Sequence, residues 1–209
     1  RVTPELIEKV ASSDWDPNKS VEDRQQKDTM AARGYFQTFE VVKESIKSVL
    51  EDENPGEVVD NDHGIWYREL FAPSVVVGLA KASDLAGYLN GPVYINGATH
   101  TPPRYEAVRD TMPVFFDLLK EEPEASVRVV LGHFIFVYIH PYFDGNGRMA
   151  RFLMNVMLAS GNYPWTVIKI DKREQYMSAL EKASVGNDIA DFTNFIGEQV
   201  SKTIDKKIV

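Results

Sequence analysis

Apolar residues recur with helical spacing along most of the chain. Residues 21–53 are rich in helix formers, and Gly34 is expected to interrupt the helix. A second long helical pattern runs over 63–89 and is expected to break near Pro73. Between the two, the Pro-Gly pair and acidic residues of 54–62 predict a loop. The buried stripe of the first helix consists of Val41, Val42, Ile46 and Leu50.

The second half of the chain continues the helical pattern. Residues 124–140 are apolar at most positions, so this helix is expected to be buried nearly all round. No internal repeat or low-complexity segment interrupts the pattern. The expected helices cover 104–122, 124–140, 147–160, 172–184 and 187–204.

One stretch, 90–103, departs from helical periodicity. Val93 and Ile95 alternate with polar residues, Asn96-Gly97 is a turn signal, and a double proline ends the stretch. This pattern predicts a short β-hairpin or an extended flap. The chain as a whole is therefore expected to be one mainly α domain with a small β-flap.

Composition narrows the classes of function. The chain has 209 residues, of which 44% are hydrophobic and 26% charged, and these proportions are those of an ordinary globular protein. With no cysteine, disulfides, thiolate metal sites and a cysteine nucleophile are excluded. The net charge is −8 and no run of Lys or Arg occurs, so we expect no nucleic-acid partner.

Membrane insertion is not expected either. The longest apolar run, 129–139, is too short to span a bilayer, which needs about 20 residues. No signal peptide is visible, and we expect a cytoplasmic protein. The sequence opens on Arg1 rather than Met, which is typical of a trimmed chain.

The stretch HPYFDGNGRMAR, residues 140–151, carries the densest polar chemistry. Pro141 disfavours helical geometry at His140, so the preceding helix should end there. Gly145 and Gly147 let the backbone turn its N–H groups toward one point. The next helix begins at about Gly147, and its first turn offers unpaired N–H groups and a positive dipole end. This combination predicts an anion site.

The side chains of this loop fit a polyphosphate. Arg148 and Arg151 lie on one face of the first turn, where a cation costs about 0.3–1 kcal/mol unless an anion is bound. Asp144 is an oxygen ligand of the kind that Mg²⁺ takes together with phosphate oxygens. His140 can accept a proton from an incoming hydroxyl. We therefore expect transfer of a phosphorus group to a hydroxyl.

The loop closely resembles the signature of Fic-domain proteins, H-P-F-x-[D/E]-G-N-G-R-x-x-R, with Tyr142 in place of Phe. The resemblance implies an α-helical enzyme that transfers AMP from Mg²⁺-bound ATP to a Ser, Thr or Tyr hydroxyl of a target protein. It implies that His140 is the base and that Asp144 holds Mg²⁺ between the α- and β-phosphates. Arg151 would reach the γ-phosphate. The remaining phosphate ligands would be Gly145, Asn146, Gly147 and Arg148.

The resemblance extends beyond the loop. Residues 93–103 look like the family's flap, which holds the target's backbone as an added strand. The resemblance predicts a Fic domain over 27–205, an N-terminal extension over 1–26 and a tail over 206–209. The flap residues expected to contact the target are Val93, Tyr94, Ile95, Asn96 and Gly97.

A regulatory motif of the family is altered in this chain. Many members carry an inhibitory helix, [S/T]-x-x-x-E-[G/N], whose Glu occupies the last arginine of the signature. The region 27–50 begins with a degenerate version, in which Thr29 and Gly34 match but Arg33 replaces the Glu. Because a cation cannot pair with Arg151, we expect this brake to be absent or to work differently.

Other interpretations stay open at this point. The same fold could transfer UMP, phosphocholine or a γ-phosphate, although Gly147 disfavours the last. A nucleotide-binding module without catalysis is a third alternative, against which the intact His140 argues. Self-modification and a homo-oligomer also stay open. His133 is expected to be a core histidine rather than a metal ligand with His140, and Tyr176 and Tyr163 are candidates for the adenine pocket.

Overall fold

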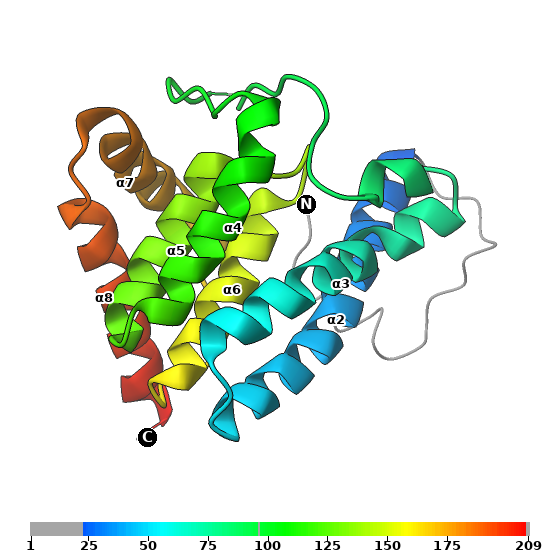
Figure 1. The fold of residues 1–209 in the computed structure, drawn as a ribbon. Coiled ribbons are helices and arrows are strands. Elements are labelled where there is room, and N and C mark those ends of the chain that lie inside the picture. Colours follow the sequence, from blue (N-terminus) through cyan, green and yellow to red (C-terminus); the bar gives the residue numbers. More distant parts are fainter. Residues whose placement is uncertain (1–22, 96, 208–209) are drawn as a thin grey trace.

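Helices build most of the part of the chain that the computed structural model describes, residues 23–95 and 97–207 (Figure 1). None of these helices is long and apolar enough to cross a membrane. The α-helices are α2 (Asp23–Leu50), α3 (Pro55–Val76), α4 (Tyr105–Glu121), α5 (Ala125–Ile139), α6 (Asn146–Ser160), α7 (Arg173–Gly186) and α8 (Ala190–Lys207). Two short 3₁₀ turns, η1 (Ala82–Leu85) and η2 (Ile170–Lys172), complete the set.

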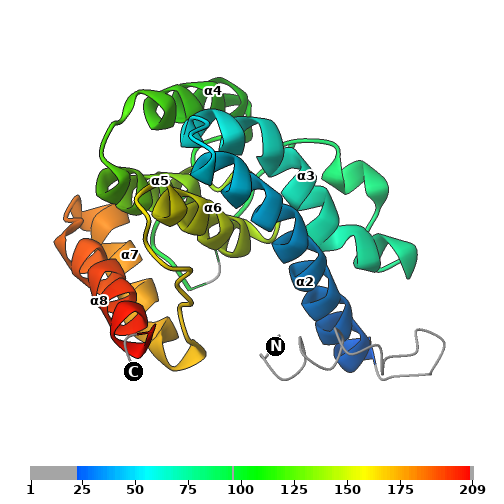
Figure 2. The ribbon, with the colours of Figure 1, turned by 90° about the horizontal axis from the view of Figure 1, so that it is seen from below.

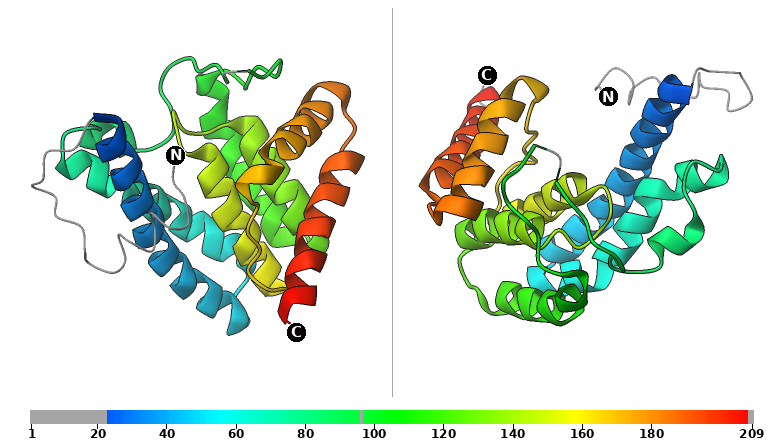
Figure 3. Two further views of the ribbon diagram at one scale, coloured as in Figure 1. Left: turned by 180° about the vertical axis from the view of Figure 1, so that it is seen from behind. Right: turned by 90° about the horizontal axis from the view of Figure 1, so that it is seen from above.

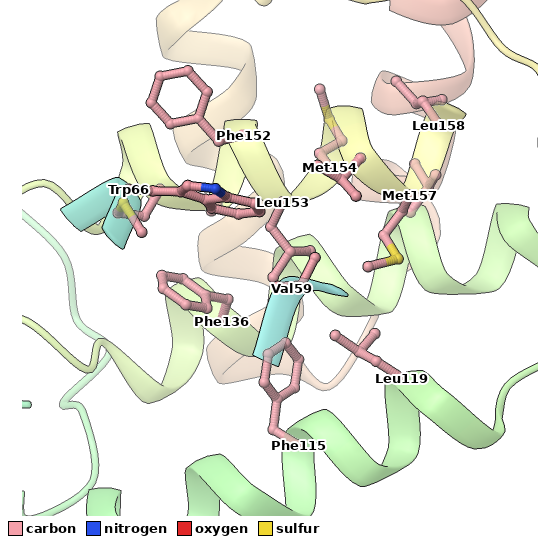
Figure 4. Packing of buried hydrophobic residues seen from close by; sticks show 14 of the residues in the cluster. Val59, Trp66, Phe115, Leu119, Phe136, Phe152, Leu153, Met154, Met157 and Leu158 are labelled. Carbon is pink, nitrogen blue, oxygen red and sulfur yellow. The ribbon is translucent and has the colours of Figure 1, made fainter. Parts of the chain in front are cut away.

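The helix α6 lies at the centre of the fold. It packs against α5, α2 and α3, and it is buried at almost every position from Met149 to Ala159. Figure 4 shows its side chains beside Val59 and Trp66 of α3 and Phe136 of α5, with Phe115 of α4 on the far side of Val59. The helix that carries the two arginines of the signature is thus held from several sides.

Helix α5 was expected to be buried nearly all round, and that prediction is wrong. Helix α5 is buried on one face, which includes Gly132, His133 and Phe136, whereas Leu131 and Tyr138 are exposed by 39% and 38%. Its near-continuous apolar sequence therefore covers both a core face and a partly exposed face. A helix that packs on one face needs apolar residues only on that face, so the apolar residues on the other faces of α5 are not required for its packing.

Two helical pairs flank the centre. Helices α2 and α3 pack together on one side, and α7 and α8 on the other, as seen from below in Figure 2. The turn from α5 into α6 lies at the end of the bundle near residues 90–95 and 97–104, which pass over it when viewed from above (Figure 3). This end of the bundle brings the signature loop and the predicted flap together.

The loop predicted over 54–62 is wrong, because these residues form the first turns of α3. The side-chain oxygen of Asn54 accepts hydrogen bonds from the backbone N–H groups of Gly56 and Glu57, at 3.0 and 3.1 Å. Pro55 stands at the first helical position, where its missing N–H costs nothing. The Asn-Pro-Gly sequence is thus a helix start, not a loop.

Helix α2 runs through Gly34, where an interruption was expected. A Cβ added at Gly34 would lie 2.0 Å from the carbonyl oxygen of Leu70 on α3. The glycine is therefore required by the close approach of two helices rather than by a break. Helix α3 itself includes Pro73 and ends at Val76, earlier than the predicted Leu89.

The predicted β-hairpin is not confirmed. No strand is found in the described residues 90–95 and 97–103, which form irregular coil with bends at Gly91 and Thr99. The N–H of Ala98 donates to the carbonyl of Ile95 at 3.2 Å, so a turn does form where Asn-Gly predicted one. Pro92 and the double proline remove N–H donors, and a lone two-stranded hairpin is marginally stable.

Candidate active site

The signature loop joins two helix ends. Helix α5 ends at Ile139, as Pro141 predicted, and His140 adopts left-handed backbone angles, φ 55° and ψ 58°. Gly145 caps α6 with φ 82°, and a Cβ there would lie 3.0 Å from the ring of Phe71. The loop is therefore sharply turned at both ends, and Gly145 cannot be replaced without strain.

The side chain of Asn146 holds the loop in shape. Its amide oxygen accepts from the N–H of Tyr142 at 2.9 Å, and its amide NH₂ donates to the carbonyl of Tyr142 at 2.6 Å. The Tyr142 ring is buried and stacks on Tyr67, with ring centroids 3.7 Å apart. These two bonds use the Asn146 oxygen and one of its two N–H donors, so the side chain serves first to fix the loop.

His140 is half-buried at the end of α5. Burial lowers the pKa of His140, while the backbone carbonyl of Val137 and the charge of Asp144 raise it. Its Nδ1 is buried without a well-aligned hydrogen bond, so the Val137 carbonyl acts on it by proximity. Nε2 is then the nitrogen left to accept a proton. A lowered pKa keeps the imidazole neutral near pH 7, as a general base requires.

Asp144 and Arg148 form an ion pair across the mouth of the loop. Nη2 of Arg148 lies 3.2 Å from Oδ2 of Asp144, and Oδ1 accepts from the N–H of Gly145 at 2.6 Å. The Asp144 side chain is 73% exposed, whereas that of Arg148 is only 19% exposed. The guanidinium also lies over the ring of Phe71, 5.0 Å from its centroid. Burial lowers the pKa of Arg148.

Arg151 follows one turn after Gly147 on the same helix face. A Cβ added at Gly147 would lie 3.4 Å from Nη1 of Arg151, so the guanidinium is turned back toward the start of α6. Its charge acts on the hydroxyls of Tyr35 and Tyr176. No carboxylate of the described residues lies within ion-pair distance of Arg151.

In the part of the chain that the structure describes, this site offers a divalent cation one carboxylate ligand, that of Asp144. Among the described residues, no group of three or more His, Asp or Glu side chains could hold a metal by itself. Asp144 is exposed and stands beside the anion site, so it fits an Mg²⁺ ion that arrives with phosphate oxygens. The residues present thus suit a metal carried by the nucleotide rather than one resident in the protein.

The flap segment is anchored on both sides of His140. The N–H of Leu89 donates to the carbonyl of Pro141 at 2.9 Å, and Nε2 of His100 lies 3.0 Å from the carbonyl oxygen of Tyr138. The N–H of Thr99 donates to Glu181 of α7 at 2.7 Å. These contacts place the stretch between them beside the catalytic candidate.

The predicted target-contacting residues lie between these anchors. Tyr94 is 82% exposed, Val93 and Ile95 are half-buried, and Gly97 has a φ of 80°. Asn96 lies outside the described residues. The geometry leaves the flap beside the mouth of the site, and its contact with a target stays a prediction.

The region of the degenerate inhibitory motif adjoins the site through α2. Thr29 is buried, Arg33 is half-buried, and Gly34 lies against α3. Tyr35, which follows the motif, is half-buried, and burial raises its pKa while the charges of Arg151 and Arg148 lower it. The Tyr35 ring also packs on Phe152 of α6. The motif thus lies where an effect on Arg151 is physically possible.

Two predicted features are core features. His133 is fully buried, with Nε2 2.8 Å from the hydroxyl of Tyr176, which confirms a core histidine. Tyr176 is likewise buried, so its ring does not line an open adenine pocket. Sequence reasoning missed Phe71 and Tyr67, which support Arg148 and Tyr142. Helical spacing marked Phe71 only as a core residue, and Tyr67 was not singled out.

Comparison with known proteins decides the family. The model of the Fic/DOC family matches residues 45–158, more than half of the chain. The chain belongs to the Fic/DOC family. This match lies within the predicted domain over 27–205, whose limits stay a prediction.

Curated relatives that carry the name Fic match part of this chain. A protein adenylyltransferase Fic from Nematostella vectensis is 36% identical over 134 residues, which are 62% of this chain and 31% of that protein. One from Drosophila willistoni is 38% identical over 134 residues, 62% of this chain and 26% of that protein. The chain thus spans less than a third of the length of these curated relatives.

Solved structures share the fold. Fic-1 of C. elegans, residues 134–508, superposes with a TM-score of 0.77 at 21% identity, over 97% of this chain and 56% of that one. A Fic domain containing signaling protein from Bacteroides thetaiotaomicron gives 0.74 at 18% identity, over 98% and 78%. These likenesses show that the helical fold predicted from the signature is correct.

Proposed function

We propose that this chain transfers AMP from Mg²⁺-bound ATP to a hydroxyl group of a target protein. The observation that carries the proposal is the juxtaposition at the α5–α6 turn. A half-buried His140 and a pair of arginines at a helix start flank one exposed carboxylate, Asp144. The name of the related adenylyltransferases, from Nematostella and Drosophila, supports AMP as the transferred group.

The phosphates would lie at the start of α6. The backbone N–H groups after Gly145 and the positive end of the helix dipole attract the anion. Arg148 would leave its pairing with Asp144 for the phosphates, and Asp144 would then be free to hold Mg²⁺. The metal supplies neutralisation of the phosphate charge. Arg151 would meet the outermost phosphate.

The transfer itself needs one proton acceptor. The target's Ser, Thr or Tyr hydroxyl oxygen forms a bond to the α-phosphorus, while the bond between that phosphorus and the bridging oxygen of the β-phosphate breaks. Pyrophosphate leaves, and the hydroxyl proton passes to Nε2 of His140. Positioning and charge stabilisation supply most of the rate enhancement in such reactions.

The absence of a carboxylate at position 33 bears on regulation. An acid there would compete with the outermost phosphate for Arg151, whereas Arg33 cannot. We therefore expect the chain to transfer AMP without the intramolecular restraint that the family's motif implies.

The proposal is tested with ATP labelled at either the α- or the γ-phosphate. The chain is incubated with Mg²⁺, each labelled ATP and a protein extract, and labelled proteins are separated. We expect label from the α-position only. Transfer of γ-label, or of neither label, would contradict AMP transfer. Parallel reactions with labelled UTP and CDP-choline would then identify another donor.

A further inference from the structure

Behind Arg151 lies a buried pair of polar side chains that the proposed reaction does not use. His133 of α5 is fully buried, and its Nε2 lies 2.8 Å from the hydroxyl of Tyr176 on α7. The His133 ring meets Tyr176 and Phe192 edge-on, with centroids 5.7 and 5.4 Å apart. Its Nδ1 has no hydrogen-bond partner. A buried polar atom without a partner is costly, so the pair calls for an explanation.

The second contact of the Tyr176 hydroxyl is Arg151. Burial is the main influence on the pKa of Tyr176, which is raised to about 12 although the charge of Arg151 and a contact between the two side chains lower it. The contact falls short of a well-aligned hydrogen bond. A cation beside the phenol oxygen favours the arrangement in which that oxygen's lone pairs face Arg151. Its O–H then donates to Nε2 of His133.

The tyrosine ring leaves the hydroxyl little freedom. It packs on Phe192 and Phe195 of α8, with centroids 6.2 and 5.8 Å away. The hydroxyl therefore stands at a fixed point that α5, α7 and α8 define together. Arg151 touches this point on one side, while its Nη1 lies close to Gly147 at the start of α6.

We propose that Tyr176, held by His133, is a positioning residue that aims the Arg151 guanidinium at the outermost phosphate of the nucleotide. An arginine without a carboxylate partner has many rotamers, and a fixed neutral acceptor selects one without cancelling its charge. A tyrosine hydroxyl can hold the Arg151 guanidinium in place without competing with the phosphate for it, whereas a carboxylate would compete. The inference rests on the proposed function, because it assigns Arg151 to the nucleotide's end.

The proposal predicts a difference between ATP and ADP, since only ATP has a third phosphate for Arg151. Binding of Mg²⁺-ATP and Mg²⁺-ADP to the full chain is measured by calorimetry for the wild type and Tyr176→Phe. We expect Tyr176→Phe to weaken ATP binding by about threefold to fivefold, somewhat less than the loss of a well-aligned hydrogen bond to a charged group. ADP should change by less than about twofold.

A double-mutant cycle separates positioning from a general loss of structure. In an Arg151→Ala background, Tyr176→Phe should no longer affect ATP affinity, because the group that it positions is absent. Equal weakening of ATP and ADP, or an undiminished effect in the Arg151→Ala background, would overturn the proposal.

The chain offers a matched control and a second variant. Tyr88→Phe removes another Tyr–His hydrogen bond, a half-buried one that joins the Tyr88 hydroxyl to His63 Nε2 at 3.0 Å, and should leave the ATP-to-ADP ratio unchanged. If Tyr176→Phe does not fold, His133→Leu tests the same link. His133→Gln, whose side-chain oxygen can accept the phenol proton, should restore the ratio. A ratio that His133→Leu leaves unchanged would count against the link.

The same measurements keep the two proposals apart. A chain that binds ATP more tightly than ADP but transfers no α-label overturns AMP transfer, and the Tyr176 comparison still applies. A wild-type chain that binds neither nucleotide overturns both proposals.

Discussion

The side chain of Asn146 makes two hydrogen bonds with the backbone of Tyr142. The Asn146 amide accepts from the Tyr142 N–H and donates to the Tyr142 carbonyl, at 2.9 and 2.6 Å. This pair closes the loop between His140 and α6, so the distance from the base to the arginines depends on it. An amide is the side chain that can do both at this position, because a carboxylate cannot donate.

Replacement of Asn146 by Ala should therefore cost stability and nucleotide binding together. We expect a loss of about 2–4 kcal/mol in the free energy of unfolding, because two buried backbone groups lose their partners. Urea unfolding and ATP calorimetry measure the two effects.

Asn155→Ala is the matched control for Asn146→Ala. Asn155 is also buried in α6 and makes the same kind of double contact with Thr166, at 2.7 and 3.1 Å. Its side-chain hydrogen bond to the 140–151 stretch, at 2.9 Å, goes to the backbone carbonyl of Arg151, within α6. It should lose similar stability and keep its ATP affinity. Equal loss of affinity in both variants would remove the special role of Asn146.

Gly34→Ala should separate α2 from α3. Its new Cβ would lie 2.0 Å from the Leu70 carbonyl oxygen, and backbone cannot yield as a flexible side chain can. We expect a loss of about 3 kcal/mol or more, in the range of severe overpacking. Gly197→Ala, with nothing within 4 Å, should instead stabilise α8 by about 0.5–1 kcal/mol. Thermal unfolding distinguishes the two, and equal effects would contradict the close helix approach.

Arg33→Glu should restore an acid at the position of the family's inhibitory glutamate. We expect transfer of α-label to fall at least about tenfold, since an acid on Arg151 competes with the outermost phosphate. Arg33→Gln also removes the native cation but adds no acid, so it should keep most of the activity. If the two variants behave alike, the alignment of this motif with 29–34 is wrong.

The buried His133 should make stability depend on pH. Burial lowers its pKa to about 3, so below its unfolded value of about 6.5 only the unfolded chain takes up the proton. Stability is thus full above pH 6.5 and falls as the pH drops toward 3. At pH 5 the loss from this group is about 2 kcal/mol relative to pH 7.

A comparison of His133→Gln with the wild type isolates that contribution, because the carboxylates act equally in both proteins. Urea unfolding at pH 7 and pH 5 should show a smaller difference for the variant. Equal pH dependence in the two proteins would mean that His133 is protonated in the folded state.

The helices and the loop were largely predictable from the sequence, because helical periodicity and the HPYFDGNGRMAR stretch are local signals. The prediction that His140 ends a helix needed only Pro141. The wrong predictions at Gly34 and 54–62 came from treating Gly as a helix breaker and Pro-Gly as a loop signal, although these residues have other structural roles here. Gly34 permits a helix crossing with Leu70, and Asn54 caps α3.

The support of the site could not be predicted in the same way. Phe71 lies under Arg148, and Tyr176 lies between His133 and Arg151, although these residues come from four different helices. Phe71 fits the apolar spacing of its helix and His133 was predicted as a core residue, but only the packing of the helices brings Phe71 to Arg148 and Tyr176 to Arg151. The flap was predictable only in part. Its turn follows from the local sequence, but strand pairing also needs a partner strand.

The most direct test of the account compares wild type and His140→Ala with α-labelled ATP and a protein extract. The variant should fold and bind ATP like the wild type, yet transfer should fall by about 10²–10⁴-fold, as expected for loss of a general base. Persistence of label transfer at the wild-type rate in His140→Ala would contradict the assignment of this loop as the catalytic centre.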